Sequence, residues 1–222
     1  MFGATGFVGR EVVRQLAVRA TPVVAHVRPK SAAEWTQKLE ALGAKVDASE
    51  WDAAALSKAI DAAKANQVYI LIGTTRHRAK ADAVDGDIYE KIDYGLTRIA
   101  VDAALASQSK PRLVYLSGIG ANANSNNAYI KARGRAEDAV KSSGLPWVIA
   151  RPAIITGDRD ESRPGERAGA VIGDGLLAVA GLFSRNLRAK YKSTTPDILA
   201  SALIRIGEAA EHDQVFDGAA LR

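Results

Sequence analysis

The sequence predicts an α/β fold: a doubly wound, mostly parallel sheet with helices on both faces and a small C-terminal elaboration. Apolar runs of strand length alternate with segments of helical period, and this pattern is typical of repeated βαβ units. A glycine-rich loop at the start of the chain leads directly into an amphipathic helix. The 222 residues, 47% of them hydrophobic, suit one well-buried domain better than two.

The expected strands are short apolar runs flanked by turn residues. They are Val23–Val27, Lys45–Asp47, Gln67–Ile72, Arg112–Leu116 and Trp147–Ala150, with a late one at Gln214–Phe216. The expected helices have apolar residues at intervals of three and four. They are Val8–Arg19, Ala32–Leu42, Ala53–Ala65, Ile88–Ser107, Tyr129–Ser142 and Asp197–Ala210. We expect a single domain over 1–222, in which 152–195 forms a substrate-side insertion.

Two of these helices carry start signals. The second has Ser31 as a cap, and Glu34 completes a capping box three residues later. Gly43 supplies its stop. The last helix opens with Thr195 as a cap and Pro196 in its first turn, where a missing N–H does no harm.

The strand that should precede the glycine loop is short. Only Met1 and Phe2 come before Gly3, whereas such a loop normally follows a buried strand of about five residues. Losing most of a central strand is expected to be severely destabilising. Two explanations stay open: the numbering starts late in the strand, or the first strand is vestigial.

The glycine loop, Gly3-Ala-Thr-Gly6-Phe-Val-Gly9, meets the requirements of diphosphate binding. A tight turn needs a residue free to take positive φ, and close backbone approach needs a residue without Cβ. The start of the following helix adds unpaired N–H groups and the positive end of a dipole. We therefore expect a nicotinamide dinucleotide at this loop. Its expected contacts are Gly3, Thr5, Gly6, Phe7, Val8, Gly9 and Arg10.

The end of the second strand distinguishes NADP(H) from NAD(H). An acidic residue there grips the ribose 2′-hydroxyl of NAD, whereas an arginine accommodates the 2′-phosphate of NADP. The sequence has His26-Val-Arg28-Pro-Lys30 and no acid, and an arginine can pair with phosphate while it stacks on adenine. NADP(H) is therefore the expected cofactor, ahead of NAD(H). The alternative interpretation of Arg28 is a solvated surface charge.

Several stretches resemble the atypical short-chain dehydrogenase/reductase superfamily. They are GATGFVG at the start, GTT at 73–75, LVYLSGIGA from Leu113, a helix that begins with tyrosine, and ARPAII from Ala150. The stretch from Arg151 to Glu166 is similar to the branch that contains the Tat-interacting-protein oxidoreductase. The resemblance implies a Rossmann-type sheet that binds NADP(H). Further expected cofactor contacts are Gly73, Thr74, Thr75, Arg133, Pro152 and Ile154.

The resemblance also implies a catalytic trio of serine, tyrosine and lysine, with the tyrosine and lysine four residues apart. Ser117, Tyr129 and Arg133 stand at these positions, so arginine replaces the expected lysine. Gly118 stands where a second serine is often found. A tyrosine acting as general acid needs its pKa, normally about 10, lowered by a nearby cation. Arg133 shares the helix face of Tyr129 and can supply that charge, but it cannot readily lose a proton.

Two functions follow from these residues. The leading hypothesis is an NADPH-dependent reductase of a small carbonyl compound, in which Tyr129 protonates the oxygen, Ser117 bonds it and Arg133 orients the ribose. The alternative is a non-catalytic NADP(H)-binding sensor or scaffold, in which Tyr129 is a half-buried tyrosine with a satisfied hydroxyl. The departures at Arg133 and Gly118 favour the alternative, whereas the spacing of Tyr129 favours the enzyme. Family analogy allows a monomer or a homodimer.

Composition argues against several other classes of protein. No cysteine is present, which rules out disulfides, thiolate metal sites and cysteine nucleophiles, and the three histidines lack metal-ligand spacing. No apolar stretch approaches the roughly 20 residues of a membrane span, so we expect a cytoplasmic protein without a membrane partner. The net charge of +5 is modest and no nucleic-acid-binding motif accompanies it. The expected partner is a small-molecule substrate and not a nucleic acid.

Overall fold

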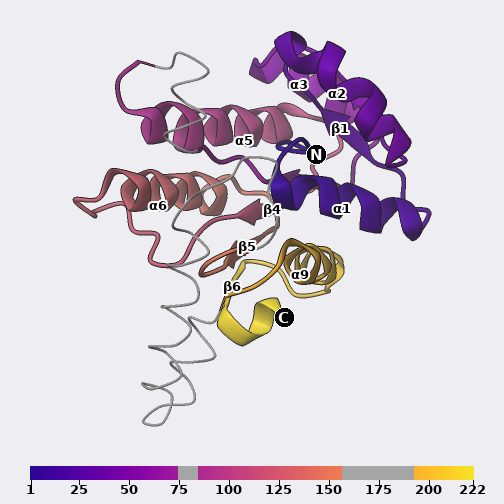
Figure 1. Cartoon of the computed structure of the whole chain (residues 1–222). Coiled ribbons are helices and arrows are strands. Elements are labelled where there is room, and N and C mark those ends of the chain that lie inside the picture. The colour runs from indigo at the N-terminus through magenta and orange to yellow at the C-terminus, as the bar shows by residue number, and fades with distance from the viewer. Residues whose placement is uncertain (75–84, 157–192) are drawn as a thin grey trace.

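The computed structural model describes residues 1–74, 85–156 and 193–222, in which parallel strands are covered by helices on both sides (Figure 1). Strand β1 (Val24–His26) pairs with β2 (Lys45–Asp47), and a second sheet runs in the order β3-β4-β5-β6. The members of the second sheet are β3 (Gln67–Ile70), β4 (Arg112–Leu116), β5 (Trp147–Arg151) and β6 (Gln214–Asp217). Every pairing within these sheets is parallel, which confirms the predicted α/β class.

Met1 and Phe2 join the two sheets. Met1 bonds to β1 through its amino group and its carbonyl, and Phe2 bonds to β3 through its N–H and its carbonyl. The partners are Val24, His26, Tyr69 and Leu71, at 2.7, 2.9, 2.8 and 2.9 Å respectively. These two residues therefore act as the central strand between β1 and β3. Counting them as the first strand gives the order 3-2-1-4-5-6-7, which extends the arrangement of doubly wound dinucleotide-binding sheets by one strand.

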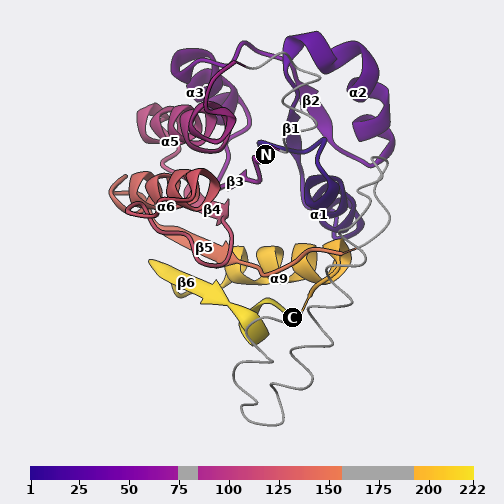
Figure 2. The ribbon, with the colours of Figure 1, turned by 60° about the vertical axis from the view of Figure 1, so that its left-hand side comes forward.

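Alternate residues of the strands face two separate cores. The helices α1 (Phe7–Val18) and α9 (Pro196–Glu208) cover one face, and α3 (Ala53–Ala62), α5 (Thr97–Ala106) and α6 (Ala128–Lys141) cover the other (Figure 2). The first core takes Val114, Leu116, Val148 and Ala150 from the sheet, and the second takes Leu113, Tyr115 and Ile149. The central strands are thus buried on both sides, as parallel strands generally are.

The second helix starts earlier than the sequence predicts. Helix α2 spans Pro29–Ala41, with Arg28 at its N-cap and no side-chain hydrogen bond at that cap. Ser31 lies inside the helix, so the predicted capping box with Glu34 is wrong. The fixed φ of Pro29 suits the first helical position, so the helix begins at Pro29 and not at Ala32. Gly43, just past the end of the helix, has φ +96°, in keeping with its predicted role as the stop.

The predicted helix Ile88–Ser107 is two segments. A π-helix, η1 (Tyr89–Leu96), leads directly into α5. Helical periodicity does not distinguish bonds to the fifth preceding residue from bonds to the fourth, so the sequence gives no sign of this change. π-Helical turns are rare and frequently lie at functional sites.

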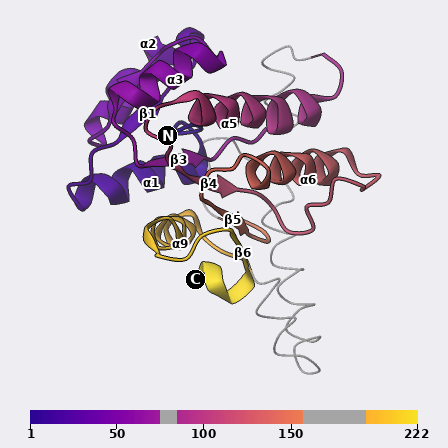
Figure 3. The same cartoon turned by 180° about the vertical axis from the view of Figure 1, so that it is seen from behind.

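The C-terminal part returns to the sheet through α9 and β6. Thr195 is the N-cap of α9, as predicted, but its side chain makes no capping bond. The late strand at Gln214 is confirmed, and a 3-10 turn, η2 (Gly218–Leu221), follows it. Seen from behind, the N-terminus lies between β1 and β3, and the C-terminus lies beside α9 (Figure 3). Of the predicted insertion 152–195, residues 157–192 lie outside the described residues.

The packing of α1 against the glycine loop predicts the effect of Gly9→Ala. A Cβ at Gly9 would lie 2.2 Å from the carbonyl oxygen of Gly3, so the backbone of the loop or of the helix would have to shift. We expect the free energy of unfolding to fall by about 2 kcal/mol or more, since overpacking of this kind typically costs ~1–3 kcal/mol. Urea unfolding followed by circular dichroism measures this loss.

Val18→Ala on the same helix is the matched control, because the Val18 side chain is 77% exposed. We expect it to change the stability by less than about 0.5 kcal/mol. Equal stability of Gly9→Ala and Val18→Ala would contradict the close approach of α1 to the loop.

Candidate functional site

The glycine loop lies between the central strand and α1. Gly3 has φ +83°, and a Cβ there would come within 2.5 Å of the carbonyl oxygen of Leu71. Gly9 lies equally close to the backbone of Gly3, whereas a Cβ at Gly6 would lie 3.1 Å from the Gly3 carbonyl oxygen. Gly3 therefore makes the tight turn and Gly9 lets the helix approach the strand. At Gly6, the absence of a side chain leaves the backbone at the start of the helix uncovered.

The start of α1 suits an anion. Gly6 is the N-cap, no side chain caps the helix, and its first turn contains no acidic residue. The N–H groups of a first helical turn have no partners within the helix, and the dipole places partial positive charge there. Among the other predicted contacts, Thr5 and Phe7 are half-buried, while Val8 points into the core. The loop thus offers backbone N–H groups to a ligand diphosphate, and its geometry fits one.

Basic residues border the gap between α1 and α2. Arg28 is half-buried directly before α2, and no acidic residue stands between His26 and Lys30. The guanidinium carbon of Arg10 lies 5.6 Å from the centre of the Trp35 ring, which joins the two helices. Two of the predicted cofactor contacts therefore lie at neighbouring helix starts, on the side of the loop where the second strand ends.

A buried ion pair lies at the carboxyl ends of β3 and β4. One Arg133 nitrogen, Nη2, lies 2.8 Å from Oδ1 of Asp93, and both side chains are buried. Nη1 of Arg133 donates to the carbonyl of Leu116 at 2.8 Å and to the Tyr115 hydroxyl at 3.3 Å. Burial raises the pKa of Asp93 to about 6, although Arg133 acts to lower it. The removal of both groups from water explains why burial outweighs the ion pair.

Arg133 has structural partners in addition to its expected role at the ribose, which stays a prediction. The sequence places Arg133 where it would orient the ribose, but its guanidinium is held by Asp93 and by the end of β4. A Cβ at Gly73 would lie 2.5 Å from Nη2, so glycine leaves space for the guanidinium directly after β3. Arg133 therefore ties α6 to η1 and the sheet. A ligand at this edge would therefore meet the positive charge of Arg133 together with the negative charge of Asp93.

Tyr129 stands at the start of α6, where Asn127 caps the helix with a bond from the Ile130 N–H. The ring is half-buried and packs edge-on against Tyr89 of η1, with centroids 5.4 Å apart. A Cβ at Gly118 would lie 3.0 Å from the Tyr129 hydroxyl oxygen. The glycine that replaces the second serine therefore lets this hydroxyl come close to the backbone that follows β4.

Ser117 belongs to the same predicted trio as Tyr129, but its hydroxyl bonds to a different residue. Its hydroxyl donates to Oε1 of Glu137 at 2.7 Å, and both residues are buried. Arg151 and Lys141 also donate to this carboxylate, at 2.5 to 3.0 Å. Burial raises the pKa of Glu137, but these hydrogen bonds outweigh it and hold the pKa below its ordinary value. Ser117 is thus anchored by an ionised carboxylate beneath α6.

The remaining predicted contacts border the same edge of the sheet. The backbone of Thr74 bonds to Asp93, and the buried Pro152 accepts from the N–H of Ile119 at 2.9 Å. Ile154 is 42% exposed. Thr75 lies outside the described residues. The structure therefore brings the loop after β3, the start of α6 and the end of β5 to one place.

Sequence reasoning missed Asp93 and Glu137. Both continue the buried stripe of a helix: Asp93 precedes Thr97 and Ala100 at intervals of four and three, and Glu137 follows Arg133 by four. An acidic residue on an apolar helix face signals a buried partner. That signal was present in the sequence, although the identity of the partner was not.

Two features are absent from the described residues. No cluster of three histidine, cysteine, aspartate or glutamate residues there has the geometry of a metal site. Within the same ranges, no helix combines the length and the apolar character needed to span a membrane.

Comparisons with known proteins point to dinucleotide binding. A family model described as NAD(P)H-binding matches residues 3–175. A relative, Protein FMP52, mitochondrial, of Candida albicans, is 34% identical over 169 residues, which is 73% of this chain and 69% of the fungal protein. The residues that the family model matches include the glycine loop and the strands from β1 to β5.

Two solved structures share the fold. WbmH of Bordetella bronchiseptica, solved with NAD+, has a TM-score of 0.66 at 18% identity, over 97% of this chain and 73% of its own. The NADPH-dependent quinone oxidoreductase QOR2 of Escherichia coli, solved with NADPH, has a TM-score of 0.64 at 20% identity. The match covers 97% of this chain and 67% of that protein's chain. At these identities the likeness shows the fold alone. The predicted Rossmann superfamily is confirmed, while the Tat-interacting-protein branch stays a prediction.

The comparisons also correct one prediction. The fungal relatives are named mitochondrial, which contradicts the expected cytoplasmic location. That expectation rested on the lack of an apolar stretch long enough to span a membrane. Such a lack does not distinguish the cytoplasm from an organelle interior.

The buried ion pair predicts a pH dependence of stability. Because the pKa of Asp93 is raised to about 6 in the folded protein, the native state binds this proton more tightly than the unfolded state does. Its contribution to stability therefore falls as the pH rises from about 4 through 6. Relative to Asp93→Asn, the wild-type free energy of unfolding should drop by roughly 2–3 kcal/mol between pH 4 and 7.

Urea unfolding of both proteins at constant ionic strength measures this difference. Asp102→Asn is the control, because Asp102 pairs with Arg98 on the partly exposed side of α5, where ion pairs contribute little. If the free energy of unfolding changed equally with pH in the wild type and in Asp93→Asn, burial would not raise the pKa of Asp93.

Proposed function

The chain belongs to the NAD(P)H-binding family, and from that membership we propose that it is an NADP(H)-dependent reductase of small carbonyl compounds. The observation that carries the proposal is the glycine loop. Side chains are excluded at Gly3 and Gly9, and the uncapped start of α1 presents backbone N–H groups beside Gly6. This cradle is suited to the diphosphate that the two nicotinamide cofactors share.

Arg28 supports NADP(H) over NAD(H). The residue stands at the start of α2, directly after β1, with no acidic residue near it in the sequence. A carboxylate at this position would repel a 2′-phosphate, whereas a guanidinium pairs with it. Arg10, held against Trp35, adds a second positive charge beside the same gap.

Tyr129 is the proposed proton donor. When bound, NADPH supplies the hydride that reduces the carbonyl carbon. The Tyr129 hydroxyl lies beside Gly118 in the loop after β4, which bonds to the loop after β5, and it can donate a proton to the substrate oxygen. Asn127 and Tyr89 fix the start of α6 and the ring orientation.

A second candidate is a non-catalytic NADP(H)-binding sensor or scaffold. It is favoured by the partners of the other two members of the trio. Arg133 is neutralised by Asp93, and Ser117 is bonded to Glu137. In this alternative, Asp93 and Glu137 serve to hold η1 and α6 on the sheet, and dinucleotide binding acts through the position of those helices.

Cofactor choice is tested by fluorescence titration with NADPH and NADH. We expect Arg28→Ala to weaken NADPH binding by about 10- to 100-fold and to change NADH binding little, because one charge-assisted phosphate contact is lost. Lys58→Ala, an exposed residue of α3, controls for a general loss of positive charge. Equal loss of NADPH and NADH affinity in Arg28→Ala would overturn the assignment to the 2′-phosphate.

Turnover is tested by NADPH oxidation with a panel of aldehydes, ketones and quinones. Tyr129→Phe keeps the ring but cannot donate a proton, so we expect the rate to fall by about 10²–10⁴-fold while NADPH affinity stays within about twofold. An unchanged rate in Tyr129→Phe would refute the role of this hydroxyl. Tight NADPH binding without turnover on any member of the panel would favour the sensor over the reductase.

A further inference from the structure

The guanidinium of Arg133 lies against the ring of Tyr129. Its central carbon is 5.4 Å from the centre of the ring, within the roughly 6 Å of a cation–π contact. The two residues are four apart on α6, so the helix itself holds them together. A positive charge this close to a phenol favours loss of the phenol proton, because the tyrosinate that forms is negative. By itself, Arg133 would therefore make Tyr129 more acidic.

Arg133 keeps its charge although it is buried. Burial acts to lower its pKa, but Tyr115, Tyr129 and Asp93 outweigh burial and raise the pKa above its ordinary value. Arginine is also the basic side chain that gives up its proton least readily. The guanidinium is therefore positive throughout the pH range in which a tyrosine titrates.

Asp93 opposes this charge. Its Oδ1 atom lies 2.8 Å from Nη2 of Arg133, and its backbone carbonyl accepts from the Thr97 hydroxyl at 2.7 Å, which fixes this turn of η1. Burial, with a smaller contribution from Asp87, raises the pKa of Asp93 to about 6. That value is still well below the ordinary tyrosine value of about 10. The carboxylate is therefore ionised whenever Tyr129 can lose its proton, and the ion pair as a whole carries no net charge.

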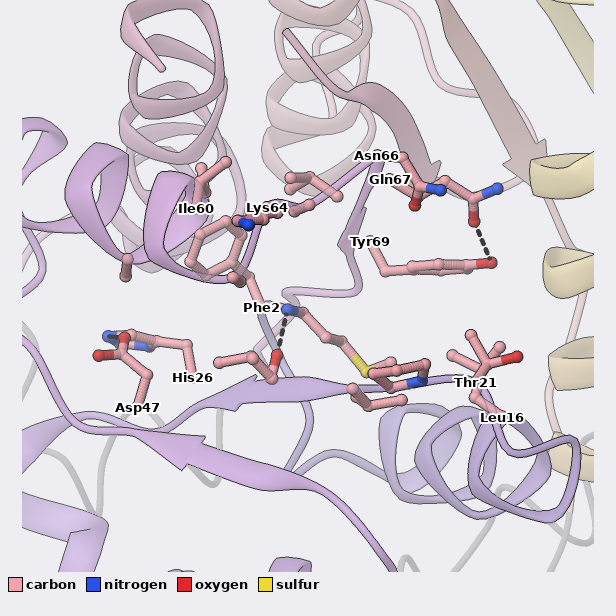
Figure 4. A pocket seen from close by; sticks show the side chains of 18 of the residues that line it. Phe2, Leu16, Thr21, His26, Asp47, Ile60, Lys64, Asn66, Gln67 and Tyr69 are labelled. Carbon is pink, nitrogen blue, oxygen red and sulfur yellow. Dashed lines mark hydrogen bonds and ion pairs between the residues drawn. The ribbon is translucent and has the colours of Figure 1, made fainter. Parts of the chain in front are cut away.

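Water does little to weaken these interactions. Arg133 is 7% exposed and Asp93 is 0% exposed. A cavity of about 430 Å³ lies elsewhere, beside Phe2 and Tyr69, and its lining residues include neither member of the ion pair (Figure 4). Charges that are shielded from solvent act on one another more strongly than exposed charges at the same separation. Asp93, Arg133 and the adjoining Tyr129 are therefore coupled electrostatically.

Other titratable groups on the neighbouring elements do not add a comparable charge. The Tyr115 hydroxyl on β4 is 3.3 Å from Nη1 of Arg133, and burial raises the pKa of Tyr115, so it stays neutral. Tyr89 of η1 meets the Tyr129 ring edge-on. Among the described residues, Asp93 is the carboxylate that balances Arg133. Two acidic side chains of η1 and α6 have basic partners of their own, namely Glu90 with Arg135, and Glu137 with Arg151 and Lys141.

We propose that Asp93 is a positioning residue that limits the acidity of Tyr129 by neutralising Arg133. The consequence for catalysis rests on the proposed reductase function. There, Tyr129 remains a phenol and gives its proton to the substrate oxygen as hydride reaches the carbonyl carbon, and the tyrosinate left behind takes a proton from water. Alcohol oxidation is the reverse reaction and needs tyrosinate as its base. The neutralised arginine therefore favours reduction over oxidation.

The test is a pH titration of Tyr129 in the protein without cofactor. Carbon-13 at Cζ of the tyrosines reports phenol ionisation by NMR, and the signal that is missing from Tyr129→Phe identifies Tyr129. We expect Asp93→Asn to lower the titration midpoint of Tyr129 by about one pH unit or more, since a charge at ~5 Å has this effect even at an effective dielectric constant of about 20. Asp102→Asn is the control, the same change at the partly exposed pair with Arg98, and should move the midpoint by less than about 0.3.

Arg133→Gln keeps the proposal testable if Asp93→Asn does not fold. This variant leaves the Asp93 carboxylate without its cation, so we expect the Tyr129 midpoint to rise. The double variant Asp93→Asn/Arg133→Gln removes both charges, and its midpoint should lie between those of the two single variants. Circular dichroism at each pH establishes that the variants are folded.

Two results would overturn the proposal. One is an unchanged Tyr129 midpoint in either folded single variant. The other is a double variant that keeps the full lowering seen in Asp93→Asn, because the effect would then not pass through Arg133. The expected midpoints without turnover on any carbonyl substrate would refute the proposed reductase and leave this role of Asp93 supported.

Discussion

The fold depends on four hydrogen bonds made by Met1 and Phe2. These bonds connect β1–β2 to the four-stranded sheet, and among the described residues they are the backbone link between the two. They also fix the position of Gly3, which follows Phe2 and turns so tightly against Leu71 that no side chain fits. The cradle for a diphosphate is therefore built on a strand of only two residues, Met1 and Phe2. Stability of that strand and ligand binding at the loop should be coupled for this reason.

Buried charge organises the other side of the site. Asp93 and Arg133 join η1, α6 and the end of β4, while Glu137 gathers Ser117, Arg151 and Lys141 under α6. Each cluster costs desolvation and repays it only while all its members are present. Such clusters fix positions more than they add stability. In the proposed reductase they hold Tyr129 at the edge of the sheet, where a small substrate would meet the bound nicotinamide ring.

The sequence predicts the fold well and the side-chain contacts poorly. Alternating strand and helix periods are local, so the parallel sheet and the glycine loop could be recognised from neighbouring residues. The start of α2 was missed because Pro29 outweighed the capping signal of Ser31. The partners of Arg133 were missed because Asp93 is distant in the chain and lies on a π-helix. The spacing of apolar residues does not reveal which face of such a helix is buried.

The central claim is that the glycine loop and the start of α1 hold the diphosphate of a nicotinamide dinucleotide. Amide hydrogen exchange with and without saturating NADPH tests it at single residues. The account predicts slowed exchange at the backbone N–H groups from Gly3 to Gly9, with little change on the far face of α3. Unchanged exchange throughout the loop, under conditions where NADPH is bound, would contradict it.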